Sequence, residues 1–527
     1  MSFVNTEFFV FIAIAVILYY IMPKKLQWIW LLILSYVYYL SFNVKAVVFI
    51  LVTTLSTYCA GRLIEQIENR GKVYLEANKE NFDREAKKAA KKRIKNRKKA
   101  VMLGTLVLNF GILAFVKYAN FFIENLNEIM GKGENGFGLL SILVPIGISF
   151  YTFQTMSYII DVYWGKVQAE RNPFKFALFV SFFPQILQGP IGRFDRMSHQ
   201  FFEAHRFDLE NIEFALQRIF WGLFKKLVLA DRTAVYVNTV FNHYENYCGF
   251  YIIVAVLMYT VQLYADFSGG MDIVIGTEQL FGIKMDENFA RPFFSKSIGE
   301  FWRRWHISLG TWMKDYIFYP FSLSKVFGNI SKFTKKHFGK QIGQTIPICI
   351  SNLLIFFIVG VWHGAAWKYI AYGMYNGVII AFSNLCKPLY KWGLEKCHIN
   401  GESKPWTLFK IIRTFILVNI GWYFDMGVSL SAAITMMKDT VYQINFAQLT
   451  DGTILGMGMK TKDFIIVAFG CAVWFVISLL QEKGIHIREA VAKRPLVIRW
   501  ALYLALIFAP AFIGYIGKTQ GFIYAQF

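Results

Sequence analysis

Residues 500–516 read WALYLALIFAPAFIGYI, a run without a single charged side chain. A helix of about 17–25 apolar residues can cross the hydrocarbon core of a bilayer, which is about 30 Å thick. Similar apolar runs recur along the chain from Phe8 to Ile516, and we expect about eleven to thirteen of them to span the membrane, together with short or re-entrant segments broken by Gly or Pro. The sequence therefore predicts an all-α, polytopic membrane protein.

The composition of the 527-residue chain supports this prediction. Hydrophobic residues make up 56% of the chain and charged residues only 17%, whereas soluble proteins carry about 25% charged residues. The formal net charge is +22, which in a soluble protein would suggest nucleic-acid binding. Lys and Arg also gather in the cytoplasmic loops of membrane proteins, so we expect membrane lipids as partners and no nucleic acid.

The distribution of basic residues predicts the orientation of the chain. Lys24 and Lys25 follow the first apolar run, and the basic stretch 483–499 precedes the last one. Because basic loops face the cytoplasm, both termini are expected outside the cell membrane and the number of spans is expected to be even. The long hydrophilic stretch 62–100, rich in lysine, is predicted to be a basic helical arm on the cytoplasmic side.

Two stretches place ionisable groups among apolar residues. They are Phe301–Pro320, FWRRWHISLGTWMKDYIFYP, and Val359–Trp367, VGVWHGAAW. Burying such groups in hydrocarbon costs several kcal/mol unless they are paired or line a wet cavity. His363 could be a neutral imidazole bonded to a neighbouring helix, or a general base, and Gly364 beside it is expected to leave the ring open on one side.

The arginine pair and two further polar stretches leave alternatives open. Arg303 and Arg304 could anchor the chain at the lipid headgroups, or bind phosphate or carboxylate groups of a donor. Asp266 and Asp272 are six residues apart, which does not place them on one helical face, so an acid–base pair is not expected. The broken run Gln185–Arg193 is expected to line a cavity or to pack inside the protein.

Taken in order, the stretches Trp302–His306 and Val361–Trp367, with Tyr264–Asp272 and Gln188–Arg193, resemble the membrane-bound O-acyltransferase family. The likeness is strongest to its bacterial branch for alginate O-acetylation, peptidoglycan O-acetylation and D-alanyl transfer to teichoic acid. It covers nearly the whole chain and implies one domain over residues 1–527, a ring of helices around a tunnel. It also implies that His363 is the catalytic histidine and His306 a second one. The candidates for the donor site and tunnel are Arg303, Arg304, Trp302, Trp305, Trp362, Asp266 and Asp315.

The C-terminal tail, residues 517–527, adds a further resemblance. Its ending Phe522–Phe527, FIYAQF, is similar to the Phe-x-Tyr-x-x-Phe ending found in envelope-acylation systems of this family. That likeness implies that Tyr524, on the extracytoplasmic side, accepts the acyl group. A phenol ester is an activated donor because the phenol has a pKa of about 10 and its anion leaves readily. The alternative is an aromatic belt at the membrane interface.

The resemblance implies an enzyme, an O-acyltransferase and most specifically an O-acetyltransferase. No bound cofactor and no metal are expected, since the six cysteines are scattered without a metal-binding spacing. The acyl donor would be acetyl-coenzyme A or an acylated carrier protein in the cytoplasm. No external segment is long enough for a domain of about 100 residues, so an extracytoplasmic serine esterase-like partner is expected to acylate a cell-envelope polysaccharide. The alternatives are D-alanyl transfer to teichoic acid and, from another class, a transporter or flippase with histidine proton relays.

Overall fold

The computed structural model describes residues 3–132, 136–515, 517 and 521–523. Within this described part, the chain is helical, and the extended backbone amounts to one isolated bridge between Phe289 and Trp305. The prediction of an all-α chain is therefore confirmed. The chain's contacts divide into two compact units, one formed by residues 1–215 and 274–285 and the other by residues 216–273 and 286–527. The single domain expected over the whole chain stays a prediction.

Seven helices in the described residues are long and apolar enough to cross a membrane. The larger number of spans expected from the sequence counted apolar runs that form shorter helices, such as Thr6–Ile21. The seven candidate spans are Val44–Ala77, Arg84–Ile129, Phe250–Leu280, Lys325–His363, Lys404–Met426, Thr461–Glu482 and Leu496–Ile513.

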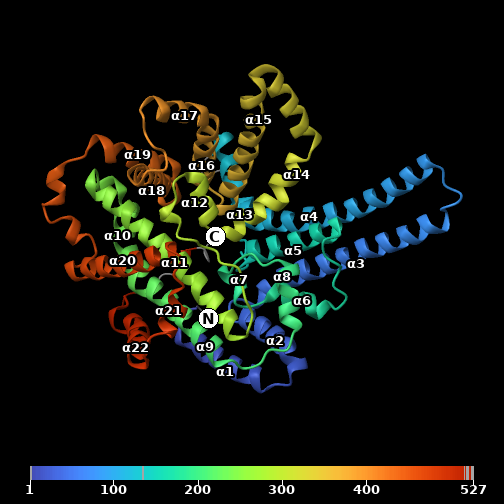
Figure 1. Ribbon diagram of the computed structural model, residues 1–527, viewed down its shortest axis with the longest axis horizontal. Coiled ribbons are helices and arrows are strands. Elements are labelled where there is room, and N and C mark those ends of the chain that lie inside the picture. Colours follow the sequence, from blue (N-terminus) through green and yellow to red (C-terminus); the bar gives the residue numbers. More distant parts are fainter. Residues whose placement is uncertain (1–2, 133–135, 516, 518–520, 524–527) are drawn as a thin grey trace. The chain divides into compact units, whose positions relative to one another are not determined.

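The first unit is built on the N-terminal helices, drawn in blue and teal in Figure 1. The expected break at Gln185–Arg193 is present: the short α7 ends at Gln188 and an irregular, largely buried chain follows. Gln185 Nε2 lies 3.1 Å from the sulfurs of both Met197 and Met285, so this break packs inside the unit. The helices are α1 (Thr6–Ile21), α2 (Gln27–Leu40), α3 (Val47–Ala77), α4 (Arg84–Ile129), α5 (Ile148–Trp164), α6 (Pro173–Ser181), α7 (Gln185–Gln188) and α8 (Phe194–Phe202), and α9 (Leu209–Leu223) begins here.

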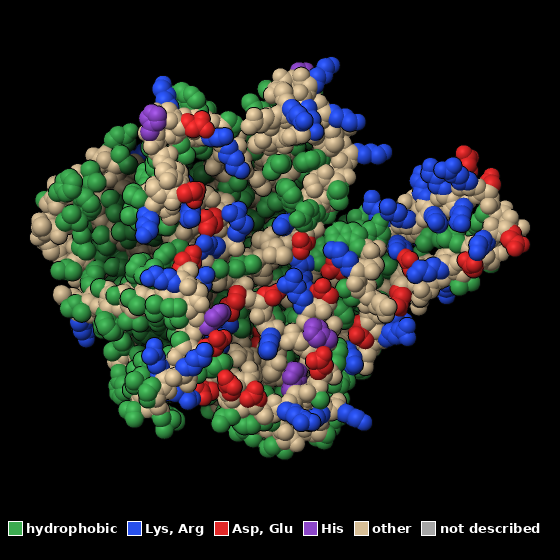
Figure 2. Space-filling view, viewed as in Figure 1, with side chains coloured by type: hydrophobic (Ala, Val, Ile, Leu, Met, Phe, Trp, Pro, Cys, Tyr) green, Lys and Arg blue, Asp and Glu red, His purple; other side chains and the backbone are tan. Residues whose placement is uncertain are grey.

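The basic arm predicted at 62–100 is helical, but it is a hairpin of two helices. It consists of the end of α3 and the start of α4, which run side by side and reverse at residues 78–83 (Figure 1). Asp83 caps α4 by accepting a hydrogen bond from the Ala86 N–H at 2.6 Å, and Lys98 of α4 pairs with Glu68 of α3. Figure 2 shows Lys and Arg side chains along this hairpin, with Asp and Glu side chains among them toward its far end. Its position on the cytoplasmic side stays a prediction.

The second unit holds both motif histidines. In this unit α15 bends at Gly339, whose φ of 75° lies in the left-handed region that favours glycine, and Thr334 Oγ1 donates to Gly343 O at 2.7 Å across the bend. The main helices are α10 (Asp231–Asn242), α11 (Phe250–Leu280), α12 (Ile298–Arg304), α13 (Ile307–Met313), α14 (Tyr319–Ser322), α15 (Lys325–His363), α16 (Trp367–Leu385), α17 (Lys387–Lys396), α18 (Lys404–Met426), α19 (Leu430–Tyr442), α20 (Thr461–Glu482), α21 (Ile487–Ala492) and α22 (Leu496–Ile513).

A π-helical segment, Phe224–Ala230, joins α9 to α10; we call it the π segment. It carries two consecutive buried lysines that bind different carboxylates of α11. Lys225 Nζ lies 2.6 Å from Asp272 Oδ2 and Lys226 Nζ lies 2.6 Å from Asp266 Oδ1. A Cβ on Gly222, just before the π segment, would lie 2.5 Å from the Gly269 carbonyl oxygen, so glycine allows the two backbones to approach. Buried lysines are tolerated in apolar surroundings because they are paired.

Candidate functional site

His306 lies in the loop between α12 and α13, outside the seven candidate spans, and its side chain is buried. Its φ of 48° is uncommon for a residue other than glycine and costs about 1–3 kcal/mol, which the surrounding contacts must offset. Asn288 supplies several of these contacts. Its carbonyl accepts a hydrogen bond from the Ile307 N–H at 3.0 Å, and its Oδ1 accepts one from the Ser308 N–H at 2.9 Å.

Asn288 also determines which nitrogen of His306 carries the proton. The His306 Nδ1 lies 3.3 Å from Asn288 Oδ1, and an amide oxygen can only accept a hydrogen bond. Nδ1 is therefore the protonated nitrogen, and Nε2 carries the lone pair. Burial, and secondarily the nearby His363, lowers the pKa of His306 to about 3. His306 is thus a neutral imidazole at physiological pH, suited to positioning a reacting group rather than to carrying a charge.

His363 is the last residue of α15 and is also buried. The Trp362 ring lies 5.2 Å from the His363 ring and 5.6 Å from the His306 ring, measured between centroids. Tyr372 of α16 meets His363 edge to face at 5.7 Å. Two histidines from distant motifs of the sequence therefore share one aromatic neighbour.

Glycines bring α16 against the end of α15 that carries His363. A Cβ on Gly373 would lie 2.2 Å from the Phe356 carbonyl oxygen, and one on Gly360 would lie 2.5 Å from the Tyr369 carbonyl oxygen. The expectation that Gly364 leaves His363 open on one side is wrong. A Cβ on Gly364 would lie 2.4 Å from the Tyr369 ring, because that ring fills the space and stacks on His363 with centroids 6.3 Å apart.

The tryptophans of the first motif have different surroundings. Trp302 donates its indole N–H to Asn376 Oδ1 of α16 at 3.0 Å, which ties α12 to α16. Trp305 is fully buried, and its ring lies 5.7 Å from the rings of both Tyr264 and Trp422. Trp305 therefore packs the interior of the second unit. Whether either ring lines a tunnel stays a prediction.

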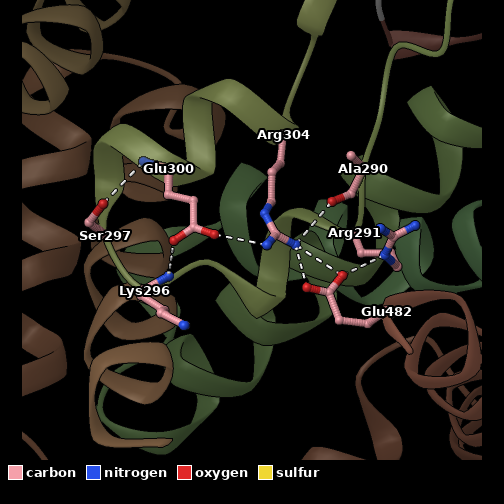
Figure 3. Close-up of polar contacts among 7 residues, drawn as sticks. All are labelled: Ala290, Arg291, Lys296, Ser297, Glu300, Arg304 and Glu482. Atoms are coloured by element: carbon pink, nitrogen blue, oxygen red, sulfur yellow. Dashed lines mark hydrogen bonds and ion pairs between the residues drawn. The ribbon is translucent and has the colours of Figure 1, made fainter. Parts of the chain in front are cut away.

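Arg304 is held by two carboxylates, as Figure 3 shows. Its Nη2 lies 2.8 Å from Glu300 Oε1, and its Nη1 lies 2.9 Å from Glu482 Oε1. Arg291 binds the other oxygen of Glu482 at 2.6 Å. These ion pairs fasten α12, and with it the His306 loop, to the end of α20. Arg303, the adjacent residue, is exposed, and the donor-binding role expected of both arginines stays a prediction.

The two aspartates expected at the donor site or tunnel lie in different elements of the second unit. Asp315 is half-buried in a second π-helical segment, Lys314–Phe318, and Asp266 is bound to Lys226. Asp266 and Asp272 bind different lysines, as expected for carboxylates that do not share a helical face. Tyr524 lies outside the described residues. The roles assigned to all these residues from the sequence stay predictions.

Several residues of the site were missed in the sequence: Asn288, Tyr369, Tyr372 and the Lys225–Lys226 pair. Only the lysines carried a usable signal, since they interrupt the apolar run WGLFKKLVLA at 221–230. Buried charges in such runs are commonly functional or paired. The other three became neighbours of the histidines only through tertiary packing.

Comparison with known proteins defines the class. The profile of the membrane-bound O-acyltransferase family matches residues 168–400, which include both histidine motifs, and the chain belongs to this family. It is thus an acyltransferase and a multi-pass membrane protein. Among its relatives, a Pseudomonas aeruginosa protein named "Probable alginate O-acetylase AlgI" is 32% identical over 91% of this chain and 83% of the relative.

Two other relatives act on different polymers, according to their names. The peptidoglycan O-acetyltransferase of Helicobacter pylori is 32% identical over 64% of this chain and 63% of its own length. The teichoic acid D-alanyltransferase of Bacillus subtilis is 30% identical over 54% of this chain and 68% of its own length. The resemblance inferred from the sequence motifs is therefore confirmed.

Proposed function

We propose that the protein is an O-acetyltransferase that passes an acetyl group from a cytoplasmic thioester, through Tyr524, to an extracytoplasmic partner that acylates a cell-envelope polysaccharide. The observation that carries the proposal is the meeting of His306 and His363 at Trp362, in a chain that aligns over 91% of its length with an O-acetylase. The thioester would be acetyl-coenzyme A or an acylated carrier protein. Both termini would face outward across the cytoplasmic membrane.

The chemical role proposed for His363 is that of general base. As the acceptor oxygen attacks the thioester carbonyl, the imidazole takes the proton of the attacking hydroxyl. The C–S bond then breaks, an oxygen ester forms, and the thiolate takes up a proton to leave as a thiol. A general base contributes about 10²- to 10⁴-fold to such a rate. His306, neutral and oriented by Asn288, would position the reacting group.

The acceptor proposed is the phenol of Tyr524. In the second step a serine hydroxyl of the partner would attack the acetyl carbonyl, and the phenol would be released with the proton that the serine gives up. The proposal is supported by the contacts of Phe522 and Ile523, which precede Tyr524 in the chain and dock on the π segment and on α11.

D-Alanyl transfer is less well supported than acetyl transfer. The D-alanyltransferase relatives align with 54% and 55% of this chain, whereas the first alginate O-acetylase relative aligns with 91%. A direct comparison of donors separates the two reactions. The purified protein in lipid vesicles would receive labelled acetyl-coenzyme A, an acetylated carrier protein or a D-alanyl carrier protein, each in a separate reaction.

The decisive readout is intact-protein mass spectrometry followed by peptide mapping. We expect one acetyl group on Tyr524 in the wild-type protein, at least a hundredfold less in His363→Gln, and none in Tyr524→Phe. His337→Gln is the matched control, because His337 is an exposed histidine of the same helix. Undiminished acetylation in His363→Gln, or an acetyl group absent from Tyr524 with every donor, would overturn the proposal.

A further inference from the structure

The chain leaving α22 returns to the region around the π segment. Arg232, just beyond that segment, donates from Nη2 to the Ile513 carbonyl at 2.7 Å, and its Nη1 pairs with Asp463. Two residues after Ile513, the Tyr515 N–H donates to the Leu227 carbonyl at 2.9 Å. A π-helical turn interrupts the regular i→i+4 ladder, and here one of its carbonyls accepts a bond from outside the helix. The chain just before the C-terminal tail is thus held by one backbone and one side-chain hydrogen bond.

The described end of the tail meets the same segment again. Phe522 is 4% exposed, and the ammonium of Lys226 lies 4.8 Å from the centroid of its ring. The Ile523 N–H donates to Asp266 Oδ2 at 2.8 Å. The other oxygen of Asp266 binds Lys226 at 2.6 Å, and Lys226 also binds Asp231 at 2.8 Å. We call Lys226, Asp231 and Asp266 the tail clamp.

We infer that the tail clamp is a binding site for the C-terminal tail, in which Lys226 selects an aromatic side chain at position 522 and Asp266 holds the backbone at position 523. The inference rests on the proposed function where it concerns chemistry: Tyr524 is covalently next to Ile523, so a clamp on Ile523 limits where the phenol can reach. The three clamp residues are positioning residues, since they act on the acceptor through the tail.

The selection of an aromatic ring follows from the burial of the clamp. The side chain of Lys226 is 1% exposed, so water competes little with a ring for its ammonium, and a desolvated cation binds the face of a ring more strongly than an exposed one. An aliphatic side chain could fill the same space but has no negative ring face. This accounts physically for a phenylalanine two residues before the tyrosine.

The charge balance of the clamp favours the bound backbone as well. Two carboxylates face one ammonium, and the N–H of Ile523 directs a partial positive charge at Oδ2 of Asp266, while Oδ1 binds Lys226. Hydrogen bonds from a neutral donor to a charged acceptor are stronger than neutral pairs. The ring contact and this hydrogen bond are both non-covalent, so the tail can be released for transfer to a partner.

The test measures docking of the tail apart from acylation. The full-length protein in detergent micelles would be treated with a carboxypeptidase, and the loss of residues 525–527, which precedes any cleavage next to position 523, followed by mass spectrometry. The variants are Phe522→Leu, which removes the ring, and Ile523→Pro, which removes the N–H. The matched controls are Phe512→Leu, at an exposed phenylalanine of α22, and Ile523→Val, which keeps the N–H. All four substitutions leave the clamp residues unchanged.

We expect Phe522→Leu and Ile523→Pro to lose the tail at least tenfold faster than wild type, and the two controls to match wild type. Phe522→Trp, which keeps an aromatic ring at this position, should lose the tail at a rate close to that of wild type. Equal rates in all variants would overturn the inference. If the rates change as expected while wild-type Tyr524 carries no acetyl group with any donor, the clamp stands and the proposed function fails. If wild-type Tyr524 is acetylated but all variants lose the tail at the wild-type rate, the proposed function stands and the clamp inference fails.

Discussion

The imidazole of His306 and the indole of Trp362 lie with their ring centroids 5.6 Å apart and their planes inclined by 60°. Trp362 directly precedes His363, so a movement of this one indole changes the surroundings of both histidines. His306 comes from the loop between α12 and α13 and His363 from the end of α15, and Trp362 contacts the rings of both.

Replacing Trp362 should therefore impair transfer, because its indole contacts both imidazoles. Trp362 is 6% exposed, and truncating a buried tryptophan to alanine costs about 3–5 kcal/mol. We expect Trp362→Ala to lower both the thermal midpoint and acetyl transfer, and Trp362→Phe, which keeps a ring, to retain much of each. The measurements are unfolding in detergent and the initial rate of transfer. A Trp362→Ala protein with wild-type rates would refute the coupling.

Asn288→Ala should destabilise the His306 loop. The substitution leaves the Ser308 N–H without its acceptor and His306 Nδ1 without Asn288 Oδ1. An unsatisfied buried donor costs about 1–3 kcal/mol. We expect a lower thermal midpoint and a rate that falls further than the loss of folded protein explains, since the tautomer of His306 is no longer imposed. Wild-type rate per folded molecule would show that Asn288 has no part in orienting the imidazole.

The stability of the protein should fall on acidification partly because of His306. In the folded chain burial lowers the pKa of His306 to about 3, whereas in the unfolded chain it is about 6.5. Between these values the unfolded state binds the proton and the folded state does not, so stability is lost as the pH falls below about 6.5. We expect the thermal midpoint of His306→Gln to decline less from pH 7 to pH 5 than that of wild type. Parallel declines would contradict this assignment.

Arg303 and Arg304 should behave differently although they are adjacent. Arg304 binds Glu300 and Glu482, so Arg304→Ala is expected to lower stability by about 1–3 kcal/mol. Arg303 is exposed, so Arg303→Ala should leave stability unchanged and raise the KM for a charged thioester donor severalfold. Each variant is the control for the other. An unchanged KM in Arg303→Ala would exclude it from donor binding.

Gly364→Ala should disturb His363 indirectly. The added Cβ would lie 2.4 Å from the Tyr369 ring, so the ring that stacks on the imidazole has to move. We expect kcat to fall about tenfold, which corresponds to about 1.4 kcal/mol of lost transition-state stabilisation, and KM to change little. Gly393→Ala is the matched control, because a Cβ there meets nothing within 4 Å. A kcat equal to that of the control would mean that the Tyr369 stack is unimportant for catalysis.

The helical architecture could be predicted from the sequence because it depends on local composition. For example, apolar runs in the sequence correspond to the observed helices Phe250–Leu280 and Lys325–His363. The reversal of the basic arm at residues 78–83 was missed, since no proline or glycine lies at that turn. The π segment was missed as well, because i→i+5 bonding has no strong residue preference that a reader of sequence can use.

The two histidines of the candidate site could be singled out in the sequence, but most of their neighbours and the geometry could not. His306 and His363 stood out because ionisable groups are rare in apolar sequence. Their meeting at Trp362 depends on the close approach of α15 and α16 at Gly360 and Gly373, and that is a tertiary event. The filling of the space beside Gly364 by Tyr369 follows from the same packing, which explains why the expectation of an open side failed.

The paired lysines of the π segment have a mechanical consequence for α11. Consecutive residues, Lys225 and Lys226, bind Asp272 and Asp266, which lie at two heights of that helix. A helix held by ion pairs at two heights cannot shift along its axis or rotate about it without breaking both pairs. Breaking them is costly, because a buried ammonium that loses its carboxylate costs several kcal/mol. The two ion pairs therefore fix both the height and the rotation of α11 relative to the π segment.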